Sequence, residues 1–462
     1  MVIEADKAPA GAEAEAAARI GARLDRLALT GAHQRLALIM AAGLVVDSVD
    51  IAVTASIGGA LVEAGFADLN GVAALAMASA FGLGLGGLVV GALADRFGRV
   101  LMLRLNILVI IAGGFGAALS PSLEELLVWR ALTALALGGE TVLAYGMLTE
   151  FAPARARGRW LAFVALLASI GLPLSMAAGR FVLPLADGWR WMLAAPSLAG
   201  LGIFALRFWL DESPRWLAAK GRFDAAEPIV ARLEREAERG RRPSAADAAA
   251  NAPHRAADMA RAGAQPERQA HPLWRRLAVA GTVHVAAMTA VFGFVSWLPT
   301  FFVASGRDVA SSALFSAVMS AGAPAGAALA LLLADRFERK WLVVAGAGAA
   351  ASLGAVYALQ SAAGPIMGVG CLTVVAIYFA ATVGLMSYAP ELFPTASRLA
   401  AIGFASALGR GAAFVLPMIV AGLFQAAGQG AVVAFVGAVL VLEAALVGAW
   451  GPRTSGRALE AL

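Results

Sequence analysis

Charged residues are scarce in this chain. Asp, Glu, Lys and Arg make up 15% of its 462 residues, while 60% are apolar, and the mean hydropathy is +0.77. Soluble domains carry about 25% charged and roughly 45–50% apolar residues. A soluble protein of this length would lack the polar side chains to cover its surface, so the composition excludes that class and indicates an integral membrane protein.

Cysteine and histidine are also nearly absent. Cys371 is the single cysteine, which excludes an intrachain disulfide and a cysteine metal cluster. The four histidines are scattered along the chain, at His33, His254, His271 and His284. We therefore expect no metal site and no cofactor. No nucleophile–base motif accompanies them, so we do not expect an enzyme.

The N-terminal stretch lacks the features of a signal peptide. Residues Met1 to Arg35 are Ala-rich and mixed in charge, without a short apolar core or a small-residue cleavage site. The first hydrophobic run is therefore expected to remain in the mature protein. The net charge is +5, but the basic residues form short clusters between apolar runs. This pattern is typical of loops at an anionic leaflet and argues against a nucleic-acid partner.

Long apolar runs dominate the rest of the chain. A helix needs about 20 mainly apolar residues to cross a bilayer, and the run lengths predict about twelve such helices, six on each side of a polar stretch. The predicted spans are 36–62, 72–94, 101–120, 124–149, 158–184, 190–210, 277–303, 312–334, 341–360, 365–389, 398–424 and 430–450.

The distribution of Lys and Arg predicts the orientation. If the N-terminus is cytoplasmic, the basic clusters near Arg96, Arg157, Arg336 and Arg398 all fall in cytoplasmic loops, as the positive-inside rule requires. We expect a multi-pass protein of the cell (inner) membrane with both termini in the cytoplasm. The predicted parts are a cytoplasmic segment (1–35), a six-helix bundle (36–210), a partly helical cytoplasmic linker without chemistry of its own (211–276), a second bundle (277–450) and a cytoplasmic tail (451–462).

An internal repeat relates the two bundles. Ala94-Asp95-Arg96-Phe97 recurs 240 residues later as Ala334–Phe337. Glu150-x-x-Pro-x-x-x-Arg157 recurs 241 residues later as Glu391-x-x-Pro-x-x-x-Arg398. Six-helix repeats in parallel orientation, with a binding site between them, are a transporter architecture.

The first copy of these motifs resembles the major facilitator superfamily. Gly91-Ala-Leu-Ala-Asp95-Arg96-Phe-Gly98-Arg99 is similar to the family's loop between helices 2 and 3, although Val100 replaces a second basic residue. In the second copy Leu331 and Glu338 stand where the pattern has glycine. The resemblance implies a charge latch that opens and closes during transport. Its expected gating residues are Gly91, Asp95, Arg96, Gly98, Arg99, Glu150, Arg157, Asp335, Arg336, Glu391 and Arg398.

Further motifs narrow the resemblance. The segment from Asp211 to Gly221 is similar to the one that follows helix 6 in sugar, organic-cation and organic-acid transporters. Asp47-x-x-Asp50, Gly138-Gly139-Glu140, Trp297-Leu-Pro-Thr300 and Pro390–Thr395 resemble aromatic-acid and nicotinate-type metabolite:proton symporters. Other metabolite–proton symporters and some exporters share these features.

Ionisable residues inside the predicted spans are the candidates for chemistry, because a charge in the bilayer core is costly unless it faces a cavity or a partner. Asp47 and Asp50 share one helix face and are candidate proton carriers. The alternative is that an arginine neutralises them and they only hold helices together. Arg130 and Glu140 lie ten residues apart on one helix and on different faces, so we expect each to meet a partner on another helix or a ligand.

Arg410 is the central cation of the second bundle. We expect its guanidinium to bind the carboxylate of an anionic substrate in two-pronged fashion; the alternative is that it neutralises Asp50 or Glu140. Trp297, Tyr145, Tyr378 and Tyr388 are candidate cavity-lining aromatics. For Glu443 and His284 we favour structural roles.

Together these features predict a monomeric secondary transporter that takes up a small organic anion, such as a nicotinate- or benzoate-type carboxylate, together with protons. A proton-driven exporter, or a carrier of sugars or organic cations, stays open as an alternative. A membrane receptor is a more distant one, because no folded signalling module is visible in the linker.

Overall fold

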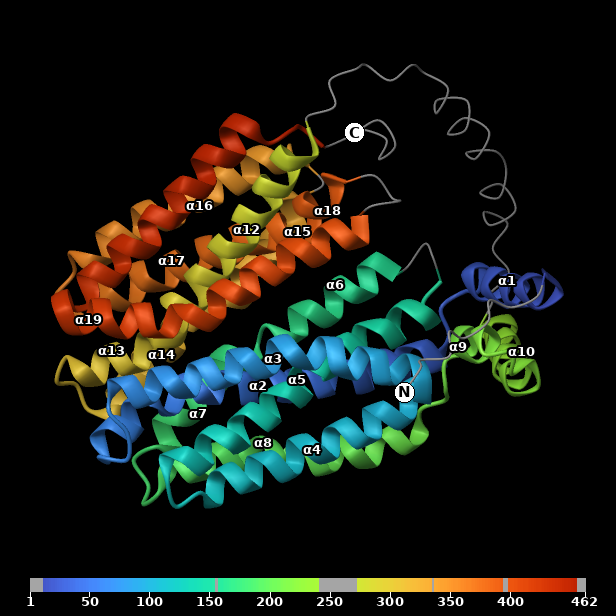
Figure 1. Ribbon diagram of the computed structural model, residues 1–462, viewed down its shortest axis with the longest axis horizontal. Helices are drawn as coiled ribbons and strands as arrows, with labels where there is room; N and C mark the ends of the chain where they lie inside the picture. The colour runs from blue at the N-terminus through green and yellow to red at the C-terminus, as the bar shows by residue number, and fades with distance from the viewer. Residues whose placement is uncertain (1–10, 154–156, 241–271, 335, 394–397, 455–462) are drawn as a thin grey trace, which may run out of the picture.

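The computed structural model describes residues 11–153, 157–240, 272–334, 336–393 and 398–454. In this part of the chain every regular element is a helix. Most helices are long and apolar and run side by side in two groups (Figure 1), with the first half of the chain in one group and the second half in the other.

The first group contains six membrane-spanning segments. They are α2 (Gly31–Glu63), α3 (Leu69–Phe97), α4 (Arg99–Leu119), α5 (Leu123–Phe151), α6 (Arg157–Ala168) continued by α7 (Gly171–Val182), and α8 (Gly188–Leu206) continued by the 3-10 turn η1 (Arg207–Trp209).

The second group contains six more. They are α12 (Leu273–Gly293) continued by η2 (Val295–Trp297) and α13 (Leu298–Ala304), α14 (Val309–Ser320) continued by α15 (Gly322–Leu333), α16 (Arg339–Ala358), α17 (Ala363–Thr382) continued by η3 (Val383–Tyr388) and α18 (Ala389–Glu391), and α19 (Arg398–Trp450). The backbone of α19 leaves the helical conformation at Gly428, with φ of 73°, so this long element is two spans. The all-helical fold of about twelve spans is therefore confirmed.

One interrupted span bears on the site. Pro299 stands at the start of α13 and has no amide hydrogen, so the carbonyl one turn earlier loses its helical partner. The chain passes through the short turn η2 at this point. Non-helical backbone at membrane depth is tolerated where it lines a cavity or is covered by protein, and this break carries Ser296, Trp297 and Thr300 to the interface between the halves.

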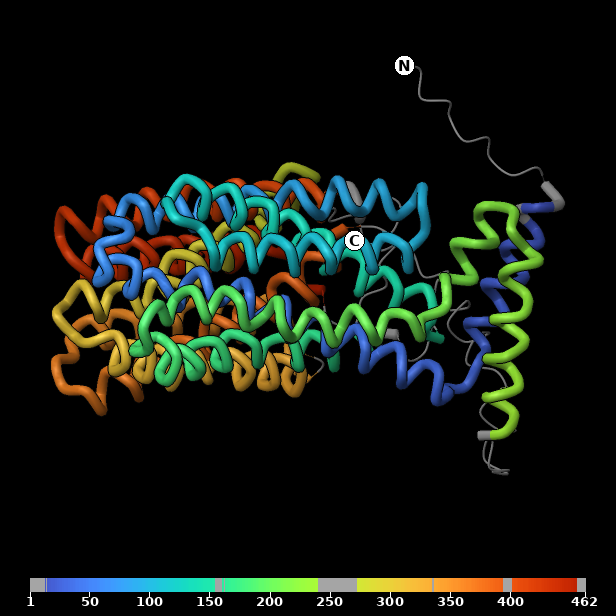
Figure 2. The backbone as a smooth tube through the Cα atoms, turned by 90° about the horizontal axis from the view of Figure 1, so that it is seen from below, coloured from blue at the N-terminus to red at the C-terminus, as the bar shows by residue number. Residues whose placement is uncertain are grey.

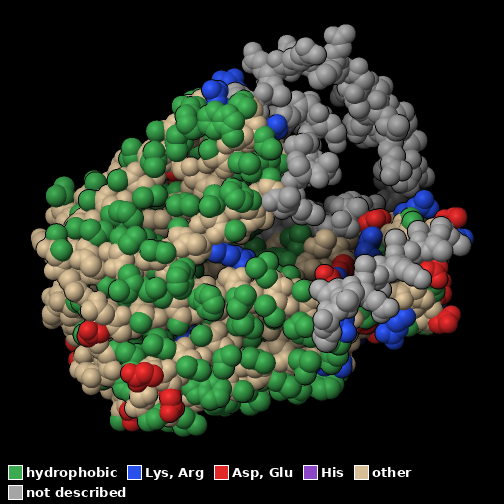
Figure 3. All heavy atoms as spheres, viewed as in Figure 1, with side chains coloured by type: hydrophobic (Ala, Val, Ile, Leu, Met, Phe, Trp, Pro, Cys, Tyr) green, Lys and Arg blue, Asp and Glu red, His purple; other side chains and the backbone are tan. Residues whose placement is uncertain are grey.

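The hydrophobic core divides unequally between the two ends of the molecule. At one end a single cluster joins side chains of both halves, among them Ile57, Leu61, Trp297 and Phe301. At the other end each half has its own separate cluster. We call this second end the linker end, because the Asp-Arg motifs and the linker lie there. Figure 3 shows the surface hollowed between the halves toward the linker end, and the core cluster that joins the two halves lies at the far end.

Three further helices cover the linker end of the first half. They are α1 (Gly11–Arg26), α9 (Pro214–Ala219) and α10 (Phe223–Gly240). Figure 2 shows α1 and α10 side by side, running across the end of the bundle rather than along it. The guanidinium of Arg23 on α1 pairs with Glu227 at 2.6 Å and with Glu234 at 2.7 Å on α10. The sequence predicted neither α1 nor its attachment to the linker.

The first testable consequence concerns the attachment of α1. The Arg23 guanidinium lowers the pKa of Glu234 below its usual 4.5, so the pair is fully charged at neutral pH. We expect Arg23→Gln to speed hydrogen–deuterium exchange in α1 several-fold at pH 7. Arg26→Gln, at an exposed position with no such pair among the described residues, should leave it unchanged.

The pH dependence has a definite sign. Because the folded-state pKa of Glu234 is depressed, the stabilisation is complete above pH 4.5 and is lost as the pH falls through the lowered value. After correction for intrinsic exchange, α1 of the native chain should lose protection only in acid. Equal exchange in Arg23→Gln and native protein at pH 7 would show that α1 is held by other contacts.

Candidate functional site

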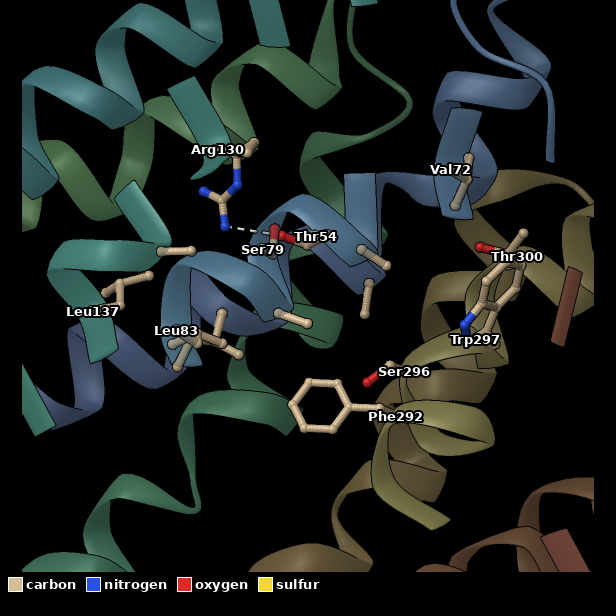
Figure 4. A pocket seen from close by; sticks show the side chains of 15 residues that line it. Thr54, Val72, Ser79, Leu83, Arg130, Leu137, Phe292, Ser296, Trp297 and Thr300 are labelled. Carbon is tan, nitrogen blue, oxygen red and sulfur yellow. Dashed lines mark hydrogen bonds between the residues drawn. The ribbon is translucent and has the colours of Figure 1, made fainter. Parts of the chain in front are cut away.

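A cavity lies between the two halves, toward the middle of the spans. It encloses about 590 Å³ of space that is partly open to solvent. Its walls come from α2, α3 and α5 on one side and from α12, η2 and α13 on the other (Figure 4). The lining is mainly apolar, with polar groups at Thr54, Ser79, Arg130, Ser296 and Thr300.

Arg130 is the charged residue in this lining. Its guanidinium donates to Asp50 Oδ1 at 2.5 Å and to the Asp50 carbonyl at 3.2 Å. It also donates to Thr54 Oγ1 at 2.8 Å, the contact drawn in Figure 4. Arg130 and Asp50 are each only 1% exposed. Arg130 on α5 thus pairs with α2, not with Glu140 on its own helix.

Glu140 has a different partner, Arg207, on the 3-10 turn that ends α8. Asn106 on α4 donates to the second oxygen of Glu140 at 3.0 Å and to the Ala136 carbonyl at 2.7 Å. Arg207 also donates to the Leu103 carbonyl. Arg207 was not among the predicted site residues, because it stands at the end of an apolar run, where an arginine usually extends to the membrane surface. Here it is fully buried.

Asp47 lies one helical turn from Asp50, toward the linker end. Its side chain is 2% exposed, and among the described residues neither carboxylate oxygen has a hydrogen-bond partner. Its charged neighbours are Glu140, Arg207 and Asp50. Asp47 therefore lies near both the Asp50–Arg130 pair and the Glu140–Arg207 pair and forms a hydrogen bond with neither.

The charges of this group do not balance. Within the described chain it contains three acids (Asp47, Asp50, Glu140) and two arginines (Arg130, Arg207). If all five were ionised, one negative charge would remain uncompensated at membrane depth. A buried unpaired charge costs several kcal/mol, so binding one proton relieves the imbalance.

Arg410 lies elsewhere. Its guanidinium is exposed at the contact of α19 with α3, where it donates to the Gly84 carbonyl at 3.2 Å, and it does not line the cavity. It contacts neither Asp50 nor Glu140. The prediction that Arg410 binds the substrate rested on its position near the middle of the span. Whether a side chain reaches this cavity also depends on the direction in which it faces around the helix axis.

Of the four predicted aromatic residues, only Trp297 lines the cavity. Tyr145 packs on the linker-end cluster of the first half and Tyr378 on the far-end cluster. Tyr388 is fully buried, and its hydroxyl donates to the Pro452 carbonyl at 3.1 Å. None of the three tyrosines lines this cavity, and their place in a substrate site stays a prediction.

Two further buried groups also lie outside the cavity lining. Glu443 on α19 is 2% exposed, and the imidazole Nδ1 of His284 on α12 lies 2.8 Å from the Ala280 carbonyl. The contact of His284 is within its own helix, so it matches the structural role favoured for that residue.

The predicted latch residues form ion pairs at the linker end. Arg99 at the start of α4 contacts Asp95 at 2.6 Å and Glu150 at 3.0 Å. In the second half Arg339 contacts Glu391 at 2.7 Å. Arg339 lies 240 residues after Arg99 and Glu391 lies 241 after Glu150, so the repeat extends to a repeated ion pair.

The remaining predicted gating residues contribute less. Arg336, the repeat counterpart of Arg96, is exposed. Arg96 is exposed and stacks over the ring of Phe97. Gly91 on α3 faces α5. Asp335 and the side chains of Arg157 and Arg398 lie outside the described residues.

Glu212 at the start of the linker contacts the predicted latch residues, and no role was predicted for it. Gly98 precedes α4 with φ of 106°, a conformation that favours glycine. This turn exposes the first amides of α4, and the Glu212 carboxylate accepts from Arg99 N at 3.0 Å and Val100 N at 3.2 Å. A carboxylate at a helix N-terminus stabilises both the free N–H groups and the helix dipole.

The neighbouring linker residues tie other spans to the same point. Trp216 Nε1 donates to the Asp95 carbonyl at 2.9 Å, and Arg215 donates to the Glu150 carbonyl at 2.8 Å. Arg215 also pairs with Asp25 on α1 at 2.8 Å. The first residues of the linker therefore hold the ends of α3, α4 and α5 together.

Comparison with known proteins identifies the family. The sequence family described as "Sugar (and other) transporter" matches residues 51–462. The chain belongs to this family. Its members belong to the major facilitator superfamily, as the motifs predicted, and they are transporters rather than enzymes.

Curated members of the family match nearly the whole chain. The inner membrane metabolite transport protein YdjE of Escherichia coli is 32% identical over 96% of this chain and 98% of its own length. The niacin transporter NiaP of Acinetobacter baylyi is 26% identical over 95% of this chain and 98% of its own. The chain is thus a multi-pass membrane transporter of the metabolite-carrying kind.

Solved structures of the xylose transporter XylE of Escherichia coli share the fold. A partially occluded inward-open form matches with a TM-score of 0.69 at 20% identity, covering 92% of this chain and 99% of that one. An inward-open form matches with a TM-score of 0.67. At this identity the likeness establishes the architecture and leaves the substrate undecided.

The buried Glu140–Arg207 pair yields a second testable prediction. Arg207→Met leaves Glu140 and Asp47 without their cation, so we expect it to destabilise the protein by about 3–5 kcal/mol. Arg207→Met combined with Glu140→Gln should recover most of this loss, because the charge imbalance then returns to that of the native protein. Thermal unfolding of the purified single and double variants measures both effects. A double variant as unstable as the sum of the single ones would show that the two residues do not interact.

Proposed function

We propose that this transporter carries a small organic anion together with a proton. The observation that supports this most directly is the uneven charge of the buried group, three acids against two arginines, beside a cavity whose charged lining residue is Arg130. When all five groups are ionised, one negative charge is uncompensated at membrane depth, and binding one proton removes the free-energy cost of that charge.

The coupling step follows from the contacts of Arg130. While Asp50 is ionised, it holds the guanidinium at 2.5 Å. Protonation of Asp50 removes the charge that competes for Arg130, and a substrate carboxylate can then take its place in a two-pronged pair. Asp47, which lacks a partner among the described residues, is the neighbouring acid that exchanges the proton with Asp50.

The lining supports an aromatic or heteroaromatic carboxylate as the substrate. Phe292 and Trp297 offer flat apolar surface, and Thr54, Ser296 and Thr300 offer hydroxyls for one or two polar ring atoms. Among the relatives, one is named a niacin transporter and another a galactose-proton symporter. The guanidinium of Arg130 in the cavity favours an anionic substrate over a sugar. In this proposal Arg130, and not Arg410, binds the substrate carboxylate.

The transport cycle in this proposal is alternating access between the two halves. The clustered basic residues of the linker end favour a cytoplasmic location for that end in the inner membrane, with both termini there. The halves are in contact at the far end and apart at the linker end, which corresponds to an inward-facing state. The pairs Arg99–Glu150 and Arg339–Glu391 stiffen the two linker-end surfaces that must meet when the carrier faces outward.

A substrate screen tests the proposed class. We expect nicotinate and benzoate to raise the melting temperature of the purified transporter and xylose, galactose and choline to leave it unchanged, because only the acids can pair with Arg130. Arg130→Gln should weaken acid binding at least about 30-fold, as loss of a charge-assisted two-pronged pair predicts. Arg410→Gln serves as the matched control and should bind normally. A shift with sugars alone would replace the anion by a sugar as the substrate.

Proton coupling is tested with Asp50→Asn. Transport of one proton together with one monoanion is electroneutral, and a gradient of one pH unit supplies about 1.4 kcal/mol, or about ten-fold accumulation. Native protein in liposomes should reach this ratio. Asp50→Asn should lose accumulation while it still exchanges labelled for unlabelled substrate, and Asp224→Asn, on exposed α10, should behave as native.

Two outcomes would contradict the coupling scheme. One is full gradient-driven accumulation by both Asp50→Asn and Glu140→Gln. The other is accumulation only in everted vesicles and never in whole cells, which would make the protein an exporter.

A further inference from the structure

A groove on the outside of the first half is separate from the transport cavity. It is lined by Arg35, Leu38, Ile39 and Ala42 of α2 and by Leu206 and Trp209 at the end of α8. The groove encloses about 1090 Å³ of open space. The helices α2 and α8 run beside each other toward the linker end, where α1 and α10 cross them (Figure 2).

The groove faces the hydrocarbon of the bilayer along most of its length. Leu38 is 61% exposed and Trp209 is 67% exposed, although both lie within membrane-spanning segments. Ile39, Ala42 and Leu206 complete an apolar floor. A soluble ligand gains nothing from such a floor in the bilayer, whereas an acyl chain lies in it without exposing polar atoms.

Arg35 closes the groove at the linker end. It is exposed, and within the described part of the chain its guanidinium has no hydrogen-bond or ion-pair partner. The position is close to the start of α2, so the charge lies at the depth of the lipid head groups while Leu38 and Ala42 continue into the apolar layer. Trp209 beside it has the amphipathic ring that favours this interface.

A second, more polar cavity shares Arg35 and Trp209 with the groove and contains Arg232, Asp211 and Glu236. The two acids are already engaged. Asp211 pairs with Arg232, and Glu236 accepts from the amide of Ala32 at 3.1 Å. Glu236 keeps its negative charge, because an amide donor does not neutralise a carboxylate, so these four charges sum to zero. Arg35 is the one among them without a hydrogen-bond or ion-pair partner in the described chain.

We infer that the groove binds an anionic phospholipid, with an acyl chain against Leu38, Ala42 and Leu206 and the phosphate on Arg35. Apolar floor, interfacial tryptophan and unpaired cation follow one another in the order in which a phospholipid presents tail, interface and phosphate. The bound lipid covers Leu206 and Trp209, which flank the buried Arg207. It therefore supports the turn that holds the Glu140–Arg207 pair.

Native mass spectrometry of the detergent-purified transporter with phosphatidylglycerol tests this inference. One basic residue near an anionic surface accounts for about a five-fold change in affinity. Arg35→Gln should therefore weaken phosphatidylglycerol binding about five-fold, and Arg222→Gln, an exposed arginine of the linker end outside the groove, should leave it unchanged. Phosphatidylcholine should bind native protein and Arg35→Gln equally weakly.

A second variant tests the groove itself. Ala42→Phe fills the floor and should weaken phosphatidylglycerol binding while Arg35 is intact. Inorganic phosphate should not compete, because it lacks the acyl chain. Unchanged phosphatidylglycerol affinity in either Arg35→Gln or Ala42→Phe would overturn the lipid site, and competition by phosphate would identify a site for soluble phosphate instead. Thermal unfolding of each variant without added lipid controls for misfolding.

Discussion

The neutralisation of buried charge is the constraint on which this structure depends. In a low-dielectric interior an ion is tolerated only beside an opposite charge or as a proton-bearing neutral group. Asp50 and Glu140 each meet an arginine from another helix, Arg130 and Arg207 respectively. These two contacts link α2 to α5 and α5 to the end of α8, so the ion pairs of the site also hold these helices together.

The same group carries the proposed chemistry because its balance is incomplete. Asp47 adds a third acid without a third cation. A fully neutral core of leucine and valine would pack as well and would have no reason to bind a proton. The extra acid lowers the stability of the fold. In the proposed function, the same acid makes the carrier respond to the proton gradient.

The unequal distribution of apolar contacts gives the molecule its asymmetry. One hydrophobic cluster contains residues of both halves at the far end, whereas at the linker end each half has its own separate cluster. The linker-end surfaces are stiffened within each half, by Arg99–Glu150 and the Glu212 cap in the first and by Arg339–Glu391 in the second. Each half is thus held together at its linker end by its own contacts.

Much of this was accessible from the amino-acid sequence alone. The length of the apolar runs determined twelve spans, since each run must match the thickness of a bilayer, and the spacing of two motifs determined the repeat. Asp47, Asp50, Arg130 and Glu140 were recognisable as functional candidates, because a charge within an apolar run needs a reason to be there. These are local properties of the chain.

Which acid meets which arginine was decided only by the tertiary structure. The partner of each buried charge lies on another helix, and the pairing depends on how each helix is rotated about its own axis and how far its end is turned inward. Arg207 at the end of a span turns into the first half, whereas Arg410 in the middle of a span is exposed at the contact of α19 with α3. Sequence position specifies depth along a helix, but packing against neighbouring helices specifies the direction in which a side chain points.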